Sequence, residues 1–296
     1  MADKRVVFDF QLEFTNGGGI QGQDFRLDID SDDIDDAELV AYIVRDLRLL
    51  MVGPARILNK RIIVEPHKRK ADDPASTRRA YVDLSHVIED GLVTYPGMPA
   101  VRICDYLSRE RSREVYAPGT EFQIASIEMV ANTGTYLDCP FHRYEHGKDL
   151  AQITPESFAD LDGIVIRADH RQKRAIDASF FRDCELRGRA VLVHTGWDAY
   201  WAVPEYAVDH PYLTEDAADY LRDCGVRLVG IDSMNIDDTR GKSRPVHSVL
   251  LGADILIVEH LCNLGALPDE GFSFSAIPPK VRGAGTFPVR ALATLR

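Results

Sequence analysis

The first 66 residues alternate apolar and polar positions in a way that predicts a small mixed unit. Val6, Phe8, Phe10 and Leu12 occupy every second position, and residues 23–29 alternate again, as half-buried strands do. Acidic residues over 32–36 precede apolar positions 39, 40, 43, 44 and 47, which lie on one face of a helix. Residues 56–64 resemble a returning strand. The predicted order over residues 1–66 is a ββαβ module.

A polar, charged and proline-containing stretch follows over residues 67–79. It has no apolar periodicity, so we expect a linker there. The pattern changes at residue 80, and the remaining segment, 80–296, is expected to form one larger domain.

Short β-branched runs alternate with helical patterns in this larger segment. The runs cover residues 124–130, 163–166, 190–193, 227–231 and 255–258. Amphipathic stretches at 155–161 and 214–221 lie between them, and Thr214 is placed as a helix N-cap. Strands that alternate with helices predict an α/β domain, and strands that look fully buried fit a central sheet or barrel.

Charge and length exclude several classes of partner. The formal net charge is -12, so the surface repels nucleic acid and anionic membranes. No run approaches the roughly 18 apolar residues of a membrane span. We expect no signal peptide and a cytoplasmic location. The five cysteines are widely spaced and without a C-x-x-C pair, which is typical of reduced thiols.

Candidate chemistry is concentrated in residues 132–142, which read NTGTYLDCPFH. Further segments occur around this stretch in a fixed order along the chain. They are Asp83-Leu84-Ser85-His86, Tyr95-Pro96-Gly97, Thr195-Gly196-Trp197, Gly230-Ile231-Asp232, His247, Glu259, Asn263-Leu264 and Pro288-Val289-Arg290.

From about Tyr81 to Leu295, this ordered set resembles the cyclase-like metal-dependent hydrolases, which include bacterial kynurenine formamidases (arylformamidases) and isatin hydrolases. The family carries H-x-G-T-H-x-D-x-P-x-H where this chain has residues 132–142. The resemblance implies a swivelling β/β/α fold with a barrel-like core. It also implies a homodimer or homotetramer. Residues 1–66 have no counterpart in it.

The resemblance implies a divalent metal, zinc or manganese, which would activate water for attack on an amide carbonyl. In the family two histidines and an aspartate bind the metal, and a final histidine shuttles the proton. Asp138 matches the aspartate and His142 the shuttle, whereas Asn132 and Tyr136 stand at the two histidine positions. Amide oxygen is a weak zinc ligand, and phenol binds well only when ionised.

A second set of positions survives this departure. Two-metal members of the family use a histidine and a glutamate from the second half of the domain, and His247 and Glu259 match them. The resemblance therefore implies one metal held by Asp138, His247 and Glu259, with His142 as acid/base. Tyr136 is a further candidate catalytic residue, as a proton donor or a substrate contact.

Three other residues are candidates for substrate binding. His86 either contacts substrate or caps the strand that it follows, while Trp197 and Trp201 either line an aromatic pocket or belong to the core. The favoured function is hydrolysis of an amide, formamide or cyclic amide C–N bond in a small molecule. Two alternatives stay open: a ligand-binding or regulatory protein without metal catalysis, and a metal-independent cyclase or dehydratase that uses Tyr136 and His142.

Overall fold

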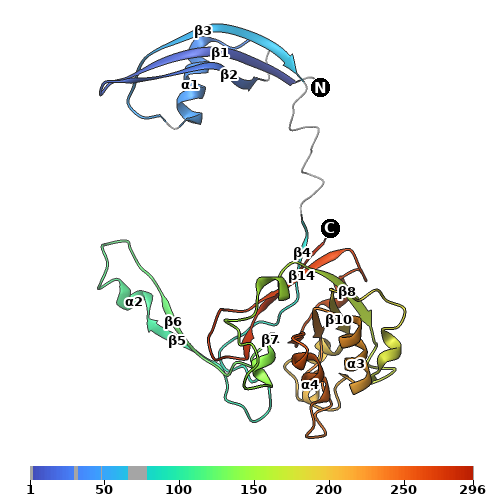
Figure 1. The fold of residues 1–296 in the computed structure, drawn as a ribbon. Helices are drawn as coiled ribbons and strands as arrows, with labels where there is room; N and C mark the ends of the chain where they lie inside the picture. The colour runs from blue at the N-terminus through green and yellow to red at the C-terminus, as the bar shows by residue number, and fades with distance from the viewer. Residues whose placement is uncertain (1–2, 30–32, 48, 66–78, 296) are drawn as a thin grey trace. The chain divides into compact units, whose positions relative to one another are not determined.

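The structure is a computed structural model that describes residues 3–29, 33–47, 49–65 and 79–295 (Figure 1). The chain divides into two compact units, residues 1–78 and 79–296. Most of the predicted linker, residues 67–78, lies outside the described residues. No helix in the described ranges is long and apolar enough to cross a membrane.

The first unit contains strands β1 (Asp3–Phe14), β2 (Gly19–Ile29) and β3 (Val52–Glu65), with helix α1 (Asp36–Asp46) between β2 and β3. The strands form an antiparallel sheet in the order β2-β1-β3. The predicted ββαβ order is therefore observed. Asp35 caps α1 by accepting a hydrogen bond from the backbone nitrogen of Glu38. Leu39 and Ile43 of α1 join Phe8 and Leu12 in the core of this unit.

The second unit is built on a sheet of nine described strands, in the order β15-β7-β13-β12-β10-β8-β14-β16-β4. Strands β13, β12, β10 and β8 are parallel, and the flanking pairs are antiparallel. The bounds are β4 Tyr81–Asp83, β7 Tyr136–Asp138, β8 Leu161–Arg167, β10 Ala190–His194, β12 Leu228–Ile231, β13 Leu256–Glu259, β14 Phe272–Ile277, β15 Thr286–Pro288 and β16 Arg290–Leu295.

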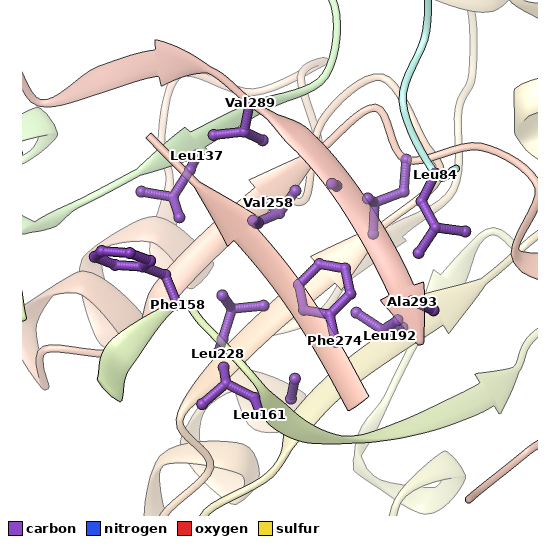
Figure 2. Close-up of a cluster of buried hydrophobic side chains, with 14 of the residues drawn as sticks. Leu84, Leu137, Phe158, Leu161, Leu192, Leu228, Val258, Phe274, Val289 and Ala293 are labelled. Carbon is purple, nitrogen blue, oxygen red and sulfur yellow. The ribbon is translucent and has the colours of Figure 1, made fainter. Parts of the chain in front are cut away.

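The sheet buries a separate core on each face, because successive strand residues point to opposite sides. Leu192, Leu228 and Phe274 belong to the cluster inside the curl of the sheet, which Figure 2 shows. On the other face Val191 and Val229 pack with residues of helices α3 (Glu215–Cys224) and α4 (Pro245–Gly252). The α/β domain with a barrel-like, half-closed sheet confirms the predicted fold class.

Strands β5 (Arg102–Leu107) and β6 (Ile124–Glu128) form a separate hairpin that extends from the body of the second unit, with the short helix α2 (Arg109–Ser112) between them (Figure 1). Every residue of β6 is exposed. The sequence prediction that residues 124–130 form a buried central strand is therefore wrong. A β-branched run does not distinguish a central strand from an exposed hairpin.

Two other local predictions have different outcomes. Residues 155–161 are not a helix, because a single 3₁₀ turn at Pro155–Ser157 precedes strand β8, which starts at Leu161. Thr214 does precede α3 as its N-cap, but its hydroxyl donates to the carbonyl of Ile176 instead of capping the helix. The small parallel pair β9 (Ala175–Ile176) and β11 (Tyr212–Leu213) lies at this point.

Candidate metal centre

The three residues of strand β7 point alternately toward the candidate site and toward the apolar core. Tyr136 and Asp138 are two positions apart and lie on one face, while Leu137 between them belongs to the apolar cluster inside the sheet (Figure 2). The neighbouring strands are in register, so Glu259 of β13 stands opposite Tyr136, and Thr286 of β15 stands opposite Asp138. Directly opposite residues of antiparallel strands have side chains on the same face.

Asp138 has one satisfied and one unsatisfied carboxylate oxygen. The residue is 0% exposed. Its Oδ1 accepts a hydrogen bond from the Thr286 hydroxyl, whereas its Oδ2 has no hydrogen-bond partner among the described residues. A buried carboxylate oxygen without a donor is costly, and such oxygens usually coordinate a cation or receive a proton.

His247 is held by a second carboxylate that orients its ring. It lies in the first turn of α4. Asp237 accepts the backbone nitrogens of Val246 and His247 at 2.8 and 3.1 Å, and Nδ1 of His247 donates to Asp237 Oδ2 at 2.6 Å. The free Nε2 lies 3.7 Å from Asp138 Oδ2. Metal-binding histidines are commonly held by a carboxylate in this way.

His142 completes a group of three potential ligands. It ends the 3₁₀ turn Pro140–His142 that follows β7, and its Nδ1 lies 2.8 Å from the Thr286 hydroxyl oxygen. In the described residues, one ligand atom each of Asp138, His142 and His247 lie within 4.8 Å of one another. Asp138 and His247 are buried, and His142 is the member at the surface.

Glu259 is committed to a different set of contacts. Its Oε2 accepts a 2.5 Å hydrogen bond from the Tyr136 hydroxyl, and its Oε1 accepts the Ile236 backbone nitrogen at 2.6 Å. The Tyr95 hydroxyl lies 2.7 Å from that of Tyr136 and 3.5 Å from Glu259 Oε2, and Asn235 adds a further donor. Tyr136 and Glu259 are each 1% exposed.

The charges of the site shift its titrating groups in a consistent direction. Burial opposes the charged form of His247, but its contacts with Asp138 and Asp237, together with Glu259, raise its pKa to about 10. Burial raises the pKa of Glu259 to about 7, although His247 opposes this shift. Burial and then Glu259 raise the pKa of Tyr136 well above its usual value, so its hydroxyl is a neutral donor.

These residues fit a divalent cation. One carboxylate oxygen and two imidazole nitrogens suit zinc or manganese. Three buried carboxylates, those of Asp138, Asp237 and Glu259, surround the buried imidazole of His247. A cation between Asp138 and His247 would meet the unpartnered Oδ2 and offset the negative charge.

The structure groups the predicted site residues differently from the expected ligand set. It brings His142, expected as acid/base, together with Asp138 and His247. Glu259, expected as a ligand, has its Oε1 3.8 Å from His247 Nε2, while its Oε2 accepts the Tyr136 hydroxyl. The reason is the β7–β13 register, which places the phenol of Tyr136 opposite the carboxylate. Asn132 is half-buried in the loop before β7.

The three predicted substrate-binding residues divide between a cavity and the core. Trp201 lines a cavity of about 470 Å³ with Leu92, Val93 and Tyr206 among others, and its ring stacks on His86 at 3.9 Å between centroids. None of Asp138, His142 and His247 lines this cavity. Trp197 is 3% exposed and donates its Nε1 to the Tyr206 carbonyl, which is a structural position.

His86 carries a second unsatisfied nitrogen. Its Nε2 is buried and has no hydrogen-bond partner in the described part of the chain. Burial lowers the pKa of His86 to about 4, with Asp198 opposing this shift, so the ring is neutral. It therefore stands beside the cavity wall as an uncharged imidazole.

Two residues of the site were not predicted from the sequence. Asp237 stands in a loop with the acidic neighbour Asp238, and an acid shortly after a buried strand is a weak signal that points to it. Thr286 has no local signal at all. Its position depends on the pairing of β15 with β7, which joins segments almost 150 residues apart.

Two kynurenine formamidases are among the relatives of this chain. The kynurenine formamidase of Geobacillus thermodenitrificans is 29% identical over 213 residues, which are 71% of this chain and 95% of that protein. The kynurenine formamidase of Bacillus cereus ATCC 14579 is 25% identical over 213 residues, which are 72% of this chain and 96% of that protein.

Solved structures with the same fold include isatin hydrolase A from Labrenzia aggregata bound to benzyl benzoate. It is 21% identical, with a TM-score of 0.63, over 77% of this chain and 98% of that one. A structure described as a potential metal-dependent hydrolase with cyclase activity is 25% identical, with a TM-score of 0.61, over 73% of this chain and 98% of that one.

The sequence model of the Cyclase family matches residues 82–238, which is more than half of the chain and includes Tyr136, Asp138 and His142. The predicted resemblance is confirmed: the chain belongs to the Cyclase family of cyclase-like metal-dependent hydrolases.

Proposed function

We propose that this protein is a metal-dependent hydrolase that cleaves the C–N bond of an amide, formamide or cyclic amide. The observation that carries the proposal is the unpartnered Oδ2 of buried Asp138, which lies 3.7 Å from the free Nε2 of His247. The similarity to kynurenine formamidases over 95% and 96% of their lengths supports the reaction class.

Asp138 and His247 are the central metal-binding residues of this proposal. When bound, zinc or manganese would polarise the substrate carbonyl and lower the pKa of an attached water. Asp237 fixes the ring of His247 through Nδ1 and directs Nε2 toward Asp138, where a bound metal would displace the Nε2 proton. Thr286 holds Asp138 by donating to its Oδ1, and this contact leaves Oδ2 available.

His142 presents its second nitrogen at the surface end of the group. Its Nδ1 is 2.8 Å from the Thr286 hydroxyl, which itself donates to Asp138, so Nδ1 is the protonated donor. Its Nε2 is then the basic nitrogen. This atom has two chemically distinct roles available: it can move a proton at the reacting amide, or it can bind the metal.

We propose a substrate whose C–N bond is attached to an aromatic ring. Both named activities among the relatives, kynurenine formamidase and isatin hydrolase, support this choice. In this chain Trp201, stacked on neutral His86, would provide a flat apolar wall for such a ring. Leu92 and Val93 add apolar surface to the same cavity.

We also propose a cytoplasmic homodimer or homotetramer. An isolated two-stranded hairpin is marginally stable in water. The β5–β6 hairpin nevertheless exposes Tyr106, Val115, Phe122 and Ile127, each more than half exposed, which supports burial against a second copy. Sedimentation of the full chain tests this, and a single monomeric species at every concentration would contradict it.

The activity is tested on full-length protein with N-formylkynurenine, isatin and simple lactones as substrates. Hydrolysis is measured after metal removal, after addition of zinc or manganese, and with a chelator present. We expect turnover of a C–N substrate that the chelator abolishes and metal restores. Full activity with the chelator present would refute the metal mechanism, and binding of these compounds without turnover would support a ligand-binding protein instead.

A further inference from the structure

The Tyr136–Glu259 pair changes which residues are free to bind a metal. Each Glu259 oxygen already accepts a short hydrogen bond, from Tyr136 at 2.5 Å and from Ile236 at 2.6 Å. The Asp138 carboxylate has an oxygen that accepts none. A metal bound to Glu259 would compete with donors that are already in place, whereas one bound to Asp138 Oδ2 would compete with nothing.

The side of the site beyond Glu259 is filled by a hydrogen-bonded network. The Tyr95 hydroxyl contacts the Tyr136 hydroxyl and the Met234 carbonyl, both at 2.7 Å. His260 lies 3.2 Å from the same hydroxyl and is itself held by Tyr206 at 2.9 Å. Tyr136, Tyr206, Glu259 and His260 are all at most 4% exposed. This network occupies the volume next to Tyr136, where the family pattern has a histidine ligand.

The open side of the site contains a replacement ligand. His142 has its Nδ1 engaged with Thr286, which leaves Nε2 as the nitrogen available to a cation. Its ring centroid lies 5.9 Å from that of His247. A ligand atom of each, together with one of Asp138, forms the only such group of histidine, cysteine and acidic side chains in the described residues.

We infer that the protein holds a single divalent metal through Asp138, His142 and His247, and that Tyr136 converts Glu259 from a ligand into a positioning residue. The inference rests on the proposed metal-dependent function, and it specifies the ligands and the stoichiometry. His142 is then a ligand and no longer a proton shuttle. Glu259 fixes Tyr136, Tyr95 and the Ile236 backbone around the metal position.

Metal binding by the full chain tests this assignment without any activity measurement. Metal-stripped protein is titrated with Zn²⁺ and Mn²⁺ by calorimetry, and bound metal is counted by elemental analysis. The informative variants are His142→Ala and Glu259→Gln. His146→Ala, which removes an exposed histidine four residues from His142, is the matched control.

We expect one equivalent of metal in the wild type and in His146→Ala. Loss of a direct ligand should weaken binding by more than the roughly 10- to 100-fold that loss of an outer partner causes, so His142→Ala should exceed that range and Glu259→Gln should stay within or below it. The visible spectrum of the Co²⁺-loaded protein should change in His142→Ala and persist in Glu259→Gln.

Three results would overturn the assignment: two equivalents in the wild type, a larger loss of affinity in Glu259→Gln than in His142→Ala, or no metal binding at all. Should Glu259→Gln fail to fold, the comparison of His142→Ala with His146→Ala still tests the ligand assignment. Metal bound through these ligands without turnover of any amide would refute only the proposed function. Metal-dependent turnover by the wild type, together with metal binding that is lost in Glu259→Gln, would refute only the ligand assignment.

Discussion

The site has two halves, one around Asp138 and His247 and one around Tyr136, Glu259 and His260. Each half contains a buried carboxylate and a histidine, but the hydrogen bonding of the carboxylate and the pKa shift of the histidine differ between them. On the Asp138 half a buried carboxylate keeps an oxygen without a donor, next to a histidine whose pKa is raised. On the Tyr136 half the carboxylate of Glu259 is surrounded by donors, and burial, with smaller contributions from His86 and His210, lowers the pKa of nearby His260 far below its usual value.

The contrast teaches that hydrogen-bond satisfaction decides which half can accept a cation. Glu259 and Asp138 are equally buried, so burial does not separate them. Their hydrogen bonds do, because both oxygens of Glu259 accept a donor, whereas Oδ2 of Asp138 accepts none among the described residues. In our proposal Glu259, the carboxylate opposite Tyr136, therefore has a changed role.

The largest effect is expected from Asp138→Asn, which removes the carboxylate charge of the Asp138 half. Amide oxygen is a poor zinc ligand, so metal affinity and turnover should both fall by more than the roughly 100-fold upper figure for outer partners. Calorimetry and the chelator-controlled assay measure the two quantities. Asp223→Asn, which changes an exposed acid on α3, is the control. Equal losses of metal affinity and turnover in both variants would show that the charge of Asp138 has no special role in the site.

Asp237→Asn should have the next largest effect. It keeps the shape of the side chain but weakens the hold on His247 Nδ1, so metal affinity should fall roughly 10- to 100-fold. The affinity of Asp238→Asn, the half-buried neighbour that pairs with Arg240, should be unchanged. An Asp237→Asn protein with wild-type affinity would show that the orientation of His247 does not depend on this contact.

Tyr136→Phe removes the hydroxyl that donates to Glu259 in the Tyr136 half, and it should lower the free energy of unfolding. Glu259 Oε2 loses its 2.5 Å donor in a buried position, which costs about 1–3 kcal/mol in the free energy of unfolding. Urea denaturation measures this loss. Tyr144→Phe removes an exposed hydroxyl that donates to the Ser248 carbonyl, and it should cost less. An unchanged stability of Tyr136→Phe would contradict the picture of Glu259 as a fully anchored group.

The smallest effect concerns the pH dependence of stability that His86 causes. His86 has a pKa of about 4 in the folded protein and about 6.5 when unfolded. Between those pH values the unfolded chain binds a proton that the folded chain refuses, so the free energy of unfolding falls as pH decreases from 6.5 to 4.

His86→Phe keeps an aromatic ring against Trp201 and removes this titration. The decrease in stability between pH 6.5 and 4 should become shallower by at most about 1.4 kcal/mol per pH unit. Denaturant titrations across that range provide the measurement, with His146→Phe as the control. A slope identical to that of the wild type would mean that His86 is already protonated in the folded state.

The sequence predicted most members of the site but not how they are divided. The resemblance to the family identifies Asp138, His142, His247 and Glu259 as candidates, and Glu259 ends the buried strand β13. The structure groups Asp138 with His142 and His247, and it joins Glu259 to Tyr136. This division depends on the β7–β13 register and on Tyr95. Such long-range pairing leaves no local periodicity in the chain.

The fold errors have the same origin. Local patterns gave the ββαβ unit and the strands β8, β10, β12 and β13 at nearly the correct positions. They failed for residues 124–130, where the same β-branched composition forms an exposed hairpin. Only the neighbours of a strand decide whether it is central, and those neighbours come from elsewhere in the chain.

The three residues of β7 also limit how this site can be altered. Tyr136 and Asp138 face the polar site, while Leu137 faces the apolar cluster. Strand β7 pairs residue by residue with both of its neighbours, β13 and β15. A slip by one residue would exchange the two faces, placing a leucine in the site and two polar groups in the core. Chemistry here can therefore be redesigned by exchanging side chains in place, but an insertion or deletion in β7 would damage catalysis and folding in a single event.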